Sequence, residues 1–378
     1  MSELLLDAFQ RALDDKRNTN SLRSLQVESD KVDFCSNDYL GLSRSLALAN
    51  RIAEIIDEYS FLPRGSTGSR LISGNNSLFE RVEQSVAAFH GAKSALFCNS
   101  GYVANLCVFS TLAGRGDTIL YDELIHASVR DGIRLSYAKG HSFRHNDLSD
   151  LETKCINARG NVFVAVEAVY SMDGDCAPLV ELVSICERYN ASLIVDEAHS
   201  TGVYGRSGKG LCEELGVLDH VFARVVTFGK AVGSHGAVIL GDQRIREYLI
   251  NFARPFFYTT ATTKSTLAEV LAAYEYLESV PIELAKLKQN IEFFRSKAFE
   301  LEIPHLLESN SAVQCILIPG CAQAREVAFH LQELGFDVRA ILSPTVTEGK
   351  ERIRICLHAF NTSLEIEQLL LELRKLVR

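Results

Sequence analysis

The sequence predicts an α/β protein in which a mostly parallel sheet is covered by helices on both faces, followed by a smaller α+β domain. Through the middle of the 378-residue chain, short apolar runs alternate with stretches of helical periodicity. Apolar runs of four to eight residues that helices separate are typical of strands buried on both faces of a parallel sheet. The length is sufficient for two domains with a sizeable core.

The expected elements of the sheet domain follow one another in order. Six apolar runs are predicted as strands: Ser94–Cys98, Thr118–Tyr121, Val162–Glu167, Ser192–Asp196, Val221–Phe228 and Gly236–Leu240. The helical patterns between them include Tyr102–Ala113, Ser128–Tyr137, Leu148–Asn157 and Leu179–Tyr189. This alternation predicts a large α/β domain over residues 45–265, which an N-terminal arm over residues 1–44 precedes.

The pattern changes after about Ala261. The elements predicted there are a helical stretch over Thr263–Leu301, a strand over Val313–Ile318, a helix over Ala324–Leu334, a strand over Ile353–Leu357 and a terminal helix from Ser363. Strands that a long helix separates from the main sheet indicate a second domain. We therefore expect a smaller α+β domain over residues 266–378.

Composition and charge favour a small-molecule partner. The net charge is −9 without any block of basic residues, whereas nucleic-acid binding needs a basic stripe. The ten cysteines are scattered singly, without the spacing of a zinc site, so no metal is expected. The first residues lack the pattern of a signal peptide, and no apolar run reaches the roughly 18 residues of a membrane span. A cytoplasmic protein with no nucleic-acid or membrane partner is expected.

Ligands of open α/β sheets bind beyond the carboxyl ends of the strands, so polar residues directly after apolar runs are candidates for a site. Asp196 ends a predicted buried strand, where a carboxylate is costly unless a cation pairs with it, and His199 follows three residues later. The alternative is a helix-capping aspartate and a solvated histidine. A helicase-type DEAH box is excluded because no GxxxxGK[ST] loop is present.

Two further strand ends carry candidate residues. Lys230 lies in a short loop with Gly229 and Gly233, where small neighbours can favour a neutral, nucleophilic amine, although most lysines are solvated surface charges. The segment Asn99–Gly101 leads from a strand into a helix whose first N–H groups can bind an anion such as phosphate. A glycine before a helix is common, so this segment alone is a weak signal.

One ligand fits the three places together. It needs a phosphate for Gly101 and Tyr102, a basic ring nitrogen for Asp196 and an aldehyde for Lys230, and pyridoxal 5′-phosphate (PLP) has all three. A carboxylate against the ring nitrogen keeps the ring protonated and makes it an electron sink. A nicotinamide-dependent oxidoreductase is disfavoured because the GxGxxG fingerprint is absent, and a non-catalytic PLP-binding protein is the other alternative.

Six stretches, in order along the chain, are similar to one known family. They are CSNDYLGL (Cys35–Leu42), GSTGSRLISG (Gly65–Gly74), HASVRDG (His126–Gly132), VYSMDGD (Val169–Asp175), DEAHSTGVYG (Asp196–Gly205) and TFGKAVG (Thr227–Gly233). Over nearly its whole length the chain resembles the α-oxoamine synthases, a family of fold-type I PLP-dependent transferases. FARPFFYTT (Phe252–Thr260) and two of these stretches most resemble members that condense L-alanine with a pimeloyl thioester. Members that use glycine or serine share the cofactor motifs.

The resemblance implies roles for the residues that match the family's motifs. Lys230 would join the PLP aldehyde, Asp196 would pair with the ring nitrogen, His199 would bond to the phenolic oxygen, and His126 would stack on the ring. The residues implied to contact the rest of the cofactor are Gly101, Tyr102, Ser171 and Thr227. Thr259 and Thr260 match a segment that reaches the phosphate of a neighbouring subunit, which implies a homodimer with shared active sites.

The resemblance also implies substrate contacts. Arg354 matches the arginine that binds the carboxylate of the amino acid, a role that suits the bidentate guanidinium. Asn37 matches an asparagine near the same substrate. Arg23 and Thr345 align with contacts to the acyl donor, although the chain is shorter than usual for the family between Arg23 and the CSNDYLGL stretch. A donor carried on coenzyme A and one carried on acyl carrier protein are both compatible with the sequence.

Overall fold

A computed structural model describes residues 2–25, 27, 30–279 and 282–377. The chain divides into two compact units. The larger unit comprises Asn37–Ser171 and Asp175–Leu287, and the smaller unit comprises Met1–Ser36, Met172–Gly174 and Lys288–Arg378. In the described part of the chain, no helix combines the length and the apolar character that crossing a membrane requires.

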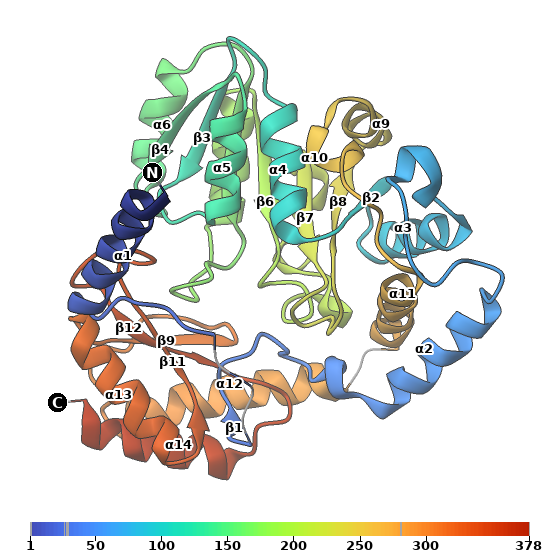
Figure 1. The fold of residues 1–378 in the computed structure, drawn as a ribbon. Coiled ribbons are helices and arrows are strands. Elements are labelled where there is room, and N and C mark those ends of the chain that lie inside the picture. The colour runs from blue at the N-terminus through green and yellow to red at the C-terminus, as the bar shows by residue number, and fades with distance from the viewer. Residues whose placement is uncertain (1, 26, 28–29, 280–281, 378) are drawn as a thin grey trace. The chain divides into compact units, whose positions relative to one another are not determined.

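A seven-stranded sheet forms the centre of the larger unit (Figure 1), with the strand order β2-β8-β7-β6-β5-β3-β4. Its strands are β2 (Ser94–Cys98), β3 (Thr118–Asp122), β4 (Lys139–Phe143), β5 (Val162–Glu167), β6 (Ala191–Asp196), β7 (Ala223–Thr227) and β8 (Ala237–Gly241). Only β8 runs antiparallel to its neighbours, β2 and β7. The predicted mostly parallel sheet is therefore confirmed.

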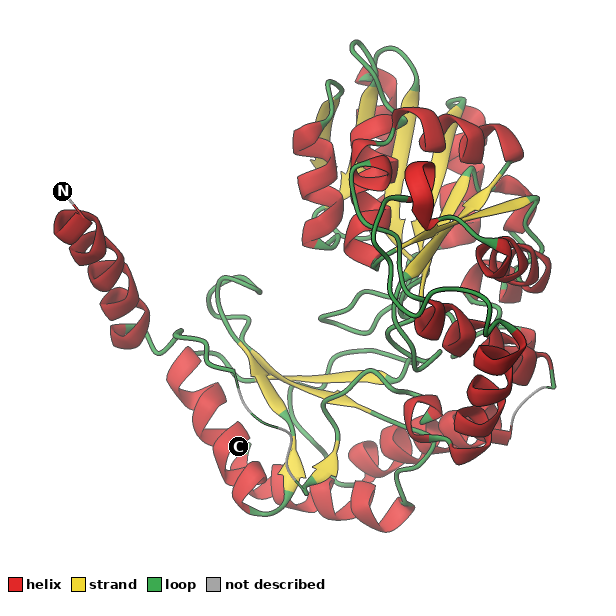
Figure 2. Ribbon diagram, turned by 45° about the vertical axis from the view of Figure 1, so that its right-hand side comes forward, coloured by secondary structure: helices red, strands yellow, loops and turns green. Residues whose placement is uncertain are grey.

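Helices cover both faces of this sheet (Figure 2), and the reason lies in the strand sequences. In β6, Ile194 packs into one apolar cluster with α4, α5, α9 and α10, whereas Leu193 and Val195 pack into another with α6, α7 and α8. Successive side chains of a strand point to opposite faces, so a continuous apolar run needs a cover on each. The helices of the larger unit are α2 (Leu46–Glu58), α3 (Ser77–Phe89), α4 (Gly101–Thr111), α5 (Ala127–Leu135), α6 (Leu148–Asn157), α7 (Leu179–Arg188), α8 (Leu211–Glu214), α9 (Gln243–Phe252), α10 (Arg254–Phe257) and α11 (Lys264–Glu278).

The smaller unit contains two small sheets, one antiparallel with the order β11-β12-β9 and one parallel pair, β1-β10. Their strands are β1 (Val32–Asp33), β9 (Val313–Leu317), β10 (Phe336–Asp337), β11 (Arg339–Ile341) and β12 (Arg352–Cys356). The helices are α1 (Ser2–Asn18), α13 (Cys321–Glu333) and α14 (Ser363–Leu376), with α12 (Ile282–Glu300) shared between the units at its start. Thr362 and Glu365 form a capping box that fixes the start of α14.

Two differences between the structure and the predicted elements have a clear cause in the sequence. The edge strand β4 was not predicted because four of its five residues are exposed, so it lacks the apolar run that identified the other strands. The stretch Thr263–Leu301, predicted as continuously helical, is wrong as one element: α11 ends at Glu278, and α12 begins at Ile282. The sequence has a proline at position 281, and proline is disfavoured inside a helix.

The units also differ from the predicted domain boundaries. The predicted arm, 1–44, is divided, since its first 36 residues belong to the smaller unit, where β1 pairs with β10 some 300 positions away. Residues 266–287, predicted in the smaller domain, belong to the larger unit, where α11 packs against α2 and α3. Both differences depend on packing between segments far apart in the sequence, which local periodicity does not report.

Candidate active site

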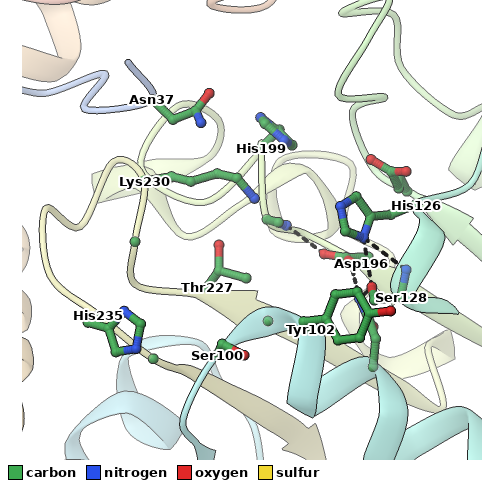
Figure 3. A pocket seen from close by; sticks show the side chains of 16 residues that line it. Asn37, Ser100, Tyr102, His126, Ser128, Asp196, His199, Thr227, Lys230 and His235 are labelled. Carbon is green, nitrogen blue, oxygen red and sulfur yellow. Dashed lines mark hydrogen bonds between the residues drawn. The ribbon is translucent and has the colours of Figure 1, made fainter. Parts of the chain in front are cut away.

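A pocket in the larger unit brings together most of the residues predicted to hold the cofactor (Figure 3). Its lining includes the predicted residues Asn37, Gly101, Tyr102, His126, Asp196, His199, Thr227 and Lys230. Asp196 is the last residue of β6, and Lys230 lies in the loop between β7 and β8. The pocket thus forms at the carboxyl ends of the parallel strands, where open α/β sheets bind their ligands.

Asp196 is buried and fixed by two donors. The side-chain N–H of Asn105 donates to Oδ2 at 2.7 Å, and the backbone N–H of Ala198 donates to Oδ1 at 3.0 Å. A buried carboxylate is costly without such partners. The two bonds orient the carboxylate while leaving it capacity to accept a further hydrogen bond from a ligand.

His126 is held through its Nδ1 atom. The backbone N–H of Ser128 donates to Nδ1 at 3.2 Å, and the hydroxyl of Ser128 lies 2.7 Å from the same atom. A backbone N–H can only donate, so Nδ1 accepts and the proton of the neutral ring is on Nε2. Burial and the positive charge of Lys230 lower the pKa of His126, although Asp196 opposes them. His126 therefore presents a neutral ring whose proton is on Nε2.

The same network joins His126 to Asp196. Asn105 donates to the hydroxyl of Ser128 at 3.0 Å as well as to Asp196. One amide of α4 therefore connects the histidine and the carboxylate, so the two side chains keep a fixed relation. Such buried polar networks are stabilising only when their members are satisfied together.

The start of α4 forms an anion-binding cradle. The hydroxyl of Ser100 caps the helix by accepting from the N–H of Val103, and Gly101 and Tyr102 are the first residues of the helix. A Cβ atom at Gly101 would lie 2.5 Å from the Cγ2 atom of Thr227, so only glycine fits there. Thr227 Oγ1 is buried, and the described residues give it no hydrogen-bond partner. Helix-start N–H groups and an unsatisfied hydroxyl suit a phosphate.

Lys230 completes the set of groups. The loop that carries it is closed by a 2.8 Å hydrogen bond from the N–H of Gly233 to the carbonyl of Lys230, and Gly233 has a φ of 70°. The Lys230 side chain points into the pocket, towards the side on which Asp196 and His126 lie (Figure 3). The residues present fit a group with a phosphate, a basic ring nitrogen and an aldehyde, as the sequence predicts for PLP.

The comparison with protein-family models agrees with this geometry. Residues 29–373 match the family described as aminotransferase class I and II. The chain belongs to this family. Among curated members, the 8-amino-7-oxononanoate synthase of Emericella nidulans is 43% identical over 97% of this chain and 94% of its own length. The enzyme of the same name from Marinobacter nauticus is 39% identical over 91% of this chain and 86% of its own length.

Solved structures of family members have the same fold. Serine palmitoyltransferase from S. paucimobilis, determined with bound PLP, superimposes with a TM-score of 0.87 at 27% identity, covering 98% of this chain and 96% of that one. An 8-amino-7-oxononanoate synthase from Francisella tularensis gives a TM-score of 0.79 at 33% identity, with 92% and 98% covered. The predicted fold-type I transferase and the resemblance to α-oxoamine synthases are confirmed.

Three predicted contacts of the larger unit lie outside the lining of the pocket. The backbone N–H of Ser171 donates to Glu167, which does line it. Thr259 lines a separate small cavity next to Phe256, and the carbonyl of Thr260 accepts from the side chain of Asn99 at 2.7 Å. The roles of Ser171, Thr259 and Thr260 toward the cofactor stay predictions.

The predicted substrate residues Arg23, Thr345 and Arg354 belong to the smaller unit. Arg23 donates to the hydroxyl of Thr345 at 2.8 Å, and both line a cavity of about 800 Å³. Arg354 is buried in β12, where its guanidinium lies 3.0 Å from the Sγ atom of Cys356. The pairing of Arg23 with Thr345 brings together two residues predicted from separate segments, while their contact with an acyl donor stays a prediction.

Sequence analysis missed several residues of the pocket. They are Asn105, Ser128, Glu167, His235 and the backbone of Gly236. Glu167 ends the apolar run of β5 just as Asp196 ends that of β6, so the same signal was present for it. Burial and the negative charge of Asp196 raise the pKa of Glu167 to about 8. Asn105 gave a weaker signal, a single amide within the apolar helix GYVANLCVF.

Proposed function

We propose that this protein uses PLP to condense L-alanine with a pimeloyl thioester, releasing CO₂ and forming 8-amino-7-oxononanoate, as in biotin biosynthesis. The observation that carries the proposal is the pocket in which Lys230, Asp196 and His126 meet the start of α4. Curated relatives at 36–43% identity that are named for this product support the choice of substrates.

Different residues of the pocket would bind different parts of PLP. The N–H groups of Gly101 and Tyr102 and the hydroxyl of Thr227 would hold the phosphate, and Asp196 would hold the ring nitrogen. His126 would contact the ring. When bound, PLP supplies an electron sink for the charge that develops on the amino-acid carbon.

The protein's own groups then bind the substrate and move one proton. By the resemblance to the family, Arg354 would bind the carboxylate of alanine in a bidentate manner, and the Nζ atom of Lys230 would take the proton from its Cα atom. That carbon would form a bond to the thioester carbonyl carbon, and the carbon–sulfur bond would break to release a thiolate, which takes a proton from water. The carboxylate leaves as CO₂, and Lys230 returns a proton to the same carbon. Asp196 would hold the nitrogen of the bound ring and so favour the electron-sink form of PLP.

Two further parts of the proposal concern the acyl donor and the assembly. Arg23 and Thr345 would bind the far end of the acyl chain, where the pimeloyl group carries a carboxylate. Thr259 and Thr260 would reach the cofactor of a second copy, so the working enzyme would be a homodimer with shared sites. Their place outside the lining of the pocket in their own chain is compatible with such a role.

A second candidate is the condensation of L-serine with a longer acyl thioester. Structures of serine palmitoyltransferase superimpose on this chain with TM-scores of 0.82 to 0.90, above the 0.79 of the oxononanoate synthase structure. Sequence identity favours the alanine reaction, since the serine palmitoyltransferases with these scores are 26–29% identical. The two candidates differ in the amino acid and in the length of the acyl chain.

The test is a substrate panel with the purified, PLP-loaded protein. L-Alanine, glycine and L-serine are each combined with acetyl, pimeloyl and palmitoyl thioesters, on coenzyme A and on acyl carrier protein, and the products are identified by mass spectrometry. We expect turnover with alanine and a pimeloyl thioester. Turnover with serine and palmitoyl thioester alone would instead select the second candidate.

Lys230→Ala is the decisive variant for the mechanism. We expect it to lose turnover and the visible absorbance of lysine-bound PLP, because among the described residues that line the pocket Lys230 is the lysine. Lys350→Ala is the matched control, since Lys350 is an exposed lysine that also follows a glycine. Normal turnover by the Lys230 variant contradicts the proposed mechanism.

A further inference from the structure

Tyr39 lies behind the pocket, and its hydroxyl touches two side chains that line it. The ring of Tyr39 is fully buried, and its hydroxyl lies 3.0 Å from Asn37 Oδ1 and 2.7 Å from His199 Nδ1. Asn37 and His199 both line the pocket, whereas the lining does not include Tyr39 itself. The hydroxyl of Tyr39 thus joins Asn37, which is predicted to lie near the amino-acid substrate, to His199, which is predicted to bond to the phenolic oxygen of PLP.

A count of protons sets the direction of these hydrogen bonds. The amide oxygen of Asn37 can only accept, so the single proton of the Tyr39 hydroxyl points to it. The phenol oxygen then accepts from His199, which places a proton on Nδ1 of that histidine. In the neutral form of this ring, Nε2 is then an acceptor. This is the reverse of His126, where Nδ1 accepts from the N–H of Ser128.

We propose that Tyr39 is a positioning residue that fixes the proton of His199 on Nδ1 and couples His199 to Asn37. This inference rests on the proposed function for its consequence, because Asn37 would sense the amino acid and His199 would face the cofactor. A change at the substrate then alters the hydrogen bond of Asn37, and the phenol transmits it to the imidazole. The hydroxyl of Tyr39 makes this coupling without touching either ligand.

The burial of Tyr39 and His199 strengthens the hydrogen bond between them. Tyr39 is 0% and His199 6% exposed, so water has little opportunity to replace this bond, while the bond to the half-buried Asn37 lies nearer the pocket. Hydrogen bonds in such an interior polarise one another along a chain. Tyr39→Phe keeps the buried ring and removes only the oxygen. Any effect of Tyr39→Phe on the tautomer of His199 or on activity therefore reports on the hydrogen bonds rather than on the packing.

The chain offers a matched control at Tyr274. This tyrosine is also fully buried, and its hydroxyl also bonds a histidine, 2.9 Å from the Nε2 atom of His90. Neither Tyr274 nor His90 lines the pocket around Lys230. Tyr274→Phe therefore removes the same kind of hydrogen bond at the same burial, away from the proposed site.

The first measurement is the tautomer of His199 by ¹⁵N NMR of the full-length protein labelled at histidine, with and without PLP. The signal is assigned with a His199→Gln variant. We expect a neutral ring protonated on Nδ1 in the wild type and a changed ratio of tautomers in Tyr39→Phe, but not in Tyr274→Phe. A His199 that is protonated on Nε2 in the wild type, or that Tyr39→Phe leaves unchanged, overturns the proposal.

The second measurement is the pH dependence of the absorbance of bound PLP, before and after addition of L-alanine. We expect alanine to shift this titration in the wild type and in Tyr274→Phe, and to shift it less in Tyr39→Phe. The expected loss in kcat/KM for Tyr39→Phe is about 10-fold. Equal shifts in all three proteins overturn the proposal. The NMR result does not depend on turnover, so failure of the proposed reaction would be recognised separately.

Discussion

In the larger unit, the pocket around Lys230 is lined by strand ends and the start of a helix, whereas the cavity around Arg23 in the smaller unit is lined largely by loop segments and α13. The first has a volume of about 220 Å³ and the second about 800 Å³. Asp196 is 7% exposed in the first, while Phe329 is 58% exposed in the second. The pocket is thus the smaller of the two and contains a buried carboxylate, whereas the larger cavity includes an exposed phenylalanine.

The two regions also differ in how their charged groups are held. Asp196 is fixed by Asn105, which in turn bonds Ser128, so each side chain depends on its neighbours. In the cavity, Arg325 holds the backbone instead, donating to the carbonyls of Asn20 and Leu22 at 2.6 and 2.5 Å. Substitutions in the network should therefore couple strongly, whereas substitutions in the cavity should act more independently.

The largest expected effect of a single substitution in the network is at Asp196. Asp196→Asn keeps the shape but removes the charge that we propose holds the ring nitrogen of PLP, so bound PLP would lose the stabilisation of its protonated form. We expect kcat to fall about 10²- to 10⁴-fold, as measured by steady-state turnover with alanine and pimeloyl thioester. The absorbance of bound PLP should change in the same variant.

Asn105→Ala tests whether the network behind Asp196 matters. Its side chain contacts Ser128 as well as Asp196, so we expect a smaller loss than for Asp196→Asn, and no additional loss in the double variant. A kcat of Asp196→Asn within twofold of the wild type would contradict the role of the carboxylate. Fully additive losses would contradict the coupling.

A smaller and more selective effect is expected at Arg23. Arg23→Gln removes the charge predicted to meet the carboxylate of the pimeloyl chain, and a hydrogen bond to a charged group contributes about 1.5–3 kcal/mol. We therefore expect KM for the pimeloyl thioester to rise about 10- to 100-fold, with kcat and KM for alanine little changed. A heptanoyl thioester, which lacks the carboxylate, should not discriminate between the two proteins.

Arg325→Ala examines the backbone support of the same cavity. Arg325→Ala should raise KM for the pimeloyl thioester less than Arg23→Gln does. It loosens residues 20–22 but keeps the positive charge of Arg23. Arg115, which packs over the ring of Tyr137 in the larger unit, provides the control as Arg115→Gln. If Arg23→Gln weakens both thioesters equally, Arg23 does not recognise the carboxylate.

The contrast between the regions also explains what the sequence could predict. The strands β2, β5 and β6 were found within one residue because they are apolar on both faces. Strands β1, β10 and β11 have two or three residues each, too few to show a periodicity, and β1 pairs with β10 some 300 positions away. Pairing over such distances leaves no local periodicity, so the smaller unit was predicted only in outline.

The site follows the same division. Asp196, His199 and Lys230 could be found because each comes soon after an apolar strand, in segments where a polar residue needs an explanation. Asn105 and Tyr39 lie within a helix and an irregular segment, and their hydrogen bonds reach residues 91 and 160 positions away. Residues that support a site from behind are revealed only by the packed structure.

The smallest effect on turnover is expected at His145, because this residue lies outside the lining of both cavities. Its Nδ1 atom is 3.0 Å from Asp122, and its Nε2 atom is 2.8 Å from Asp175. Burial alone would lower the pKa of His145, but hydrogen bonds to the two carboxylates outweigh it and raise the pKa to about 10. The ordinary value is about 6.5, so the folded state binds this proton more tightly than the unfolded state.

His145 should therefore make its full contribution to the free energy of unfolding below about pH 6.5. This contribution should fall as the pH rises to about 10, by at most about 1.4 kcal/mol per pH unit. We expect the Tm of His145→Gln to be lower at pH 6 and to fall less between pH 7 and 10 than that of the wild type. His330→Gln is the control, because His330 is exposed and lies 3.9 Å from Glu326. Parallel Tm curves would show that the imidazolium is not paired. Turnover per folded molecule at pH 7 should stay unchanged, which separates this cluster from the pocket and the cavity alike.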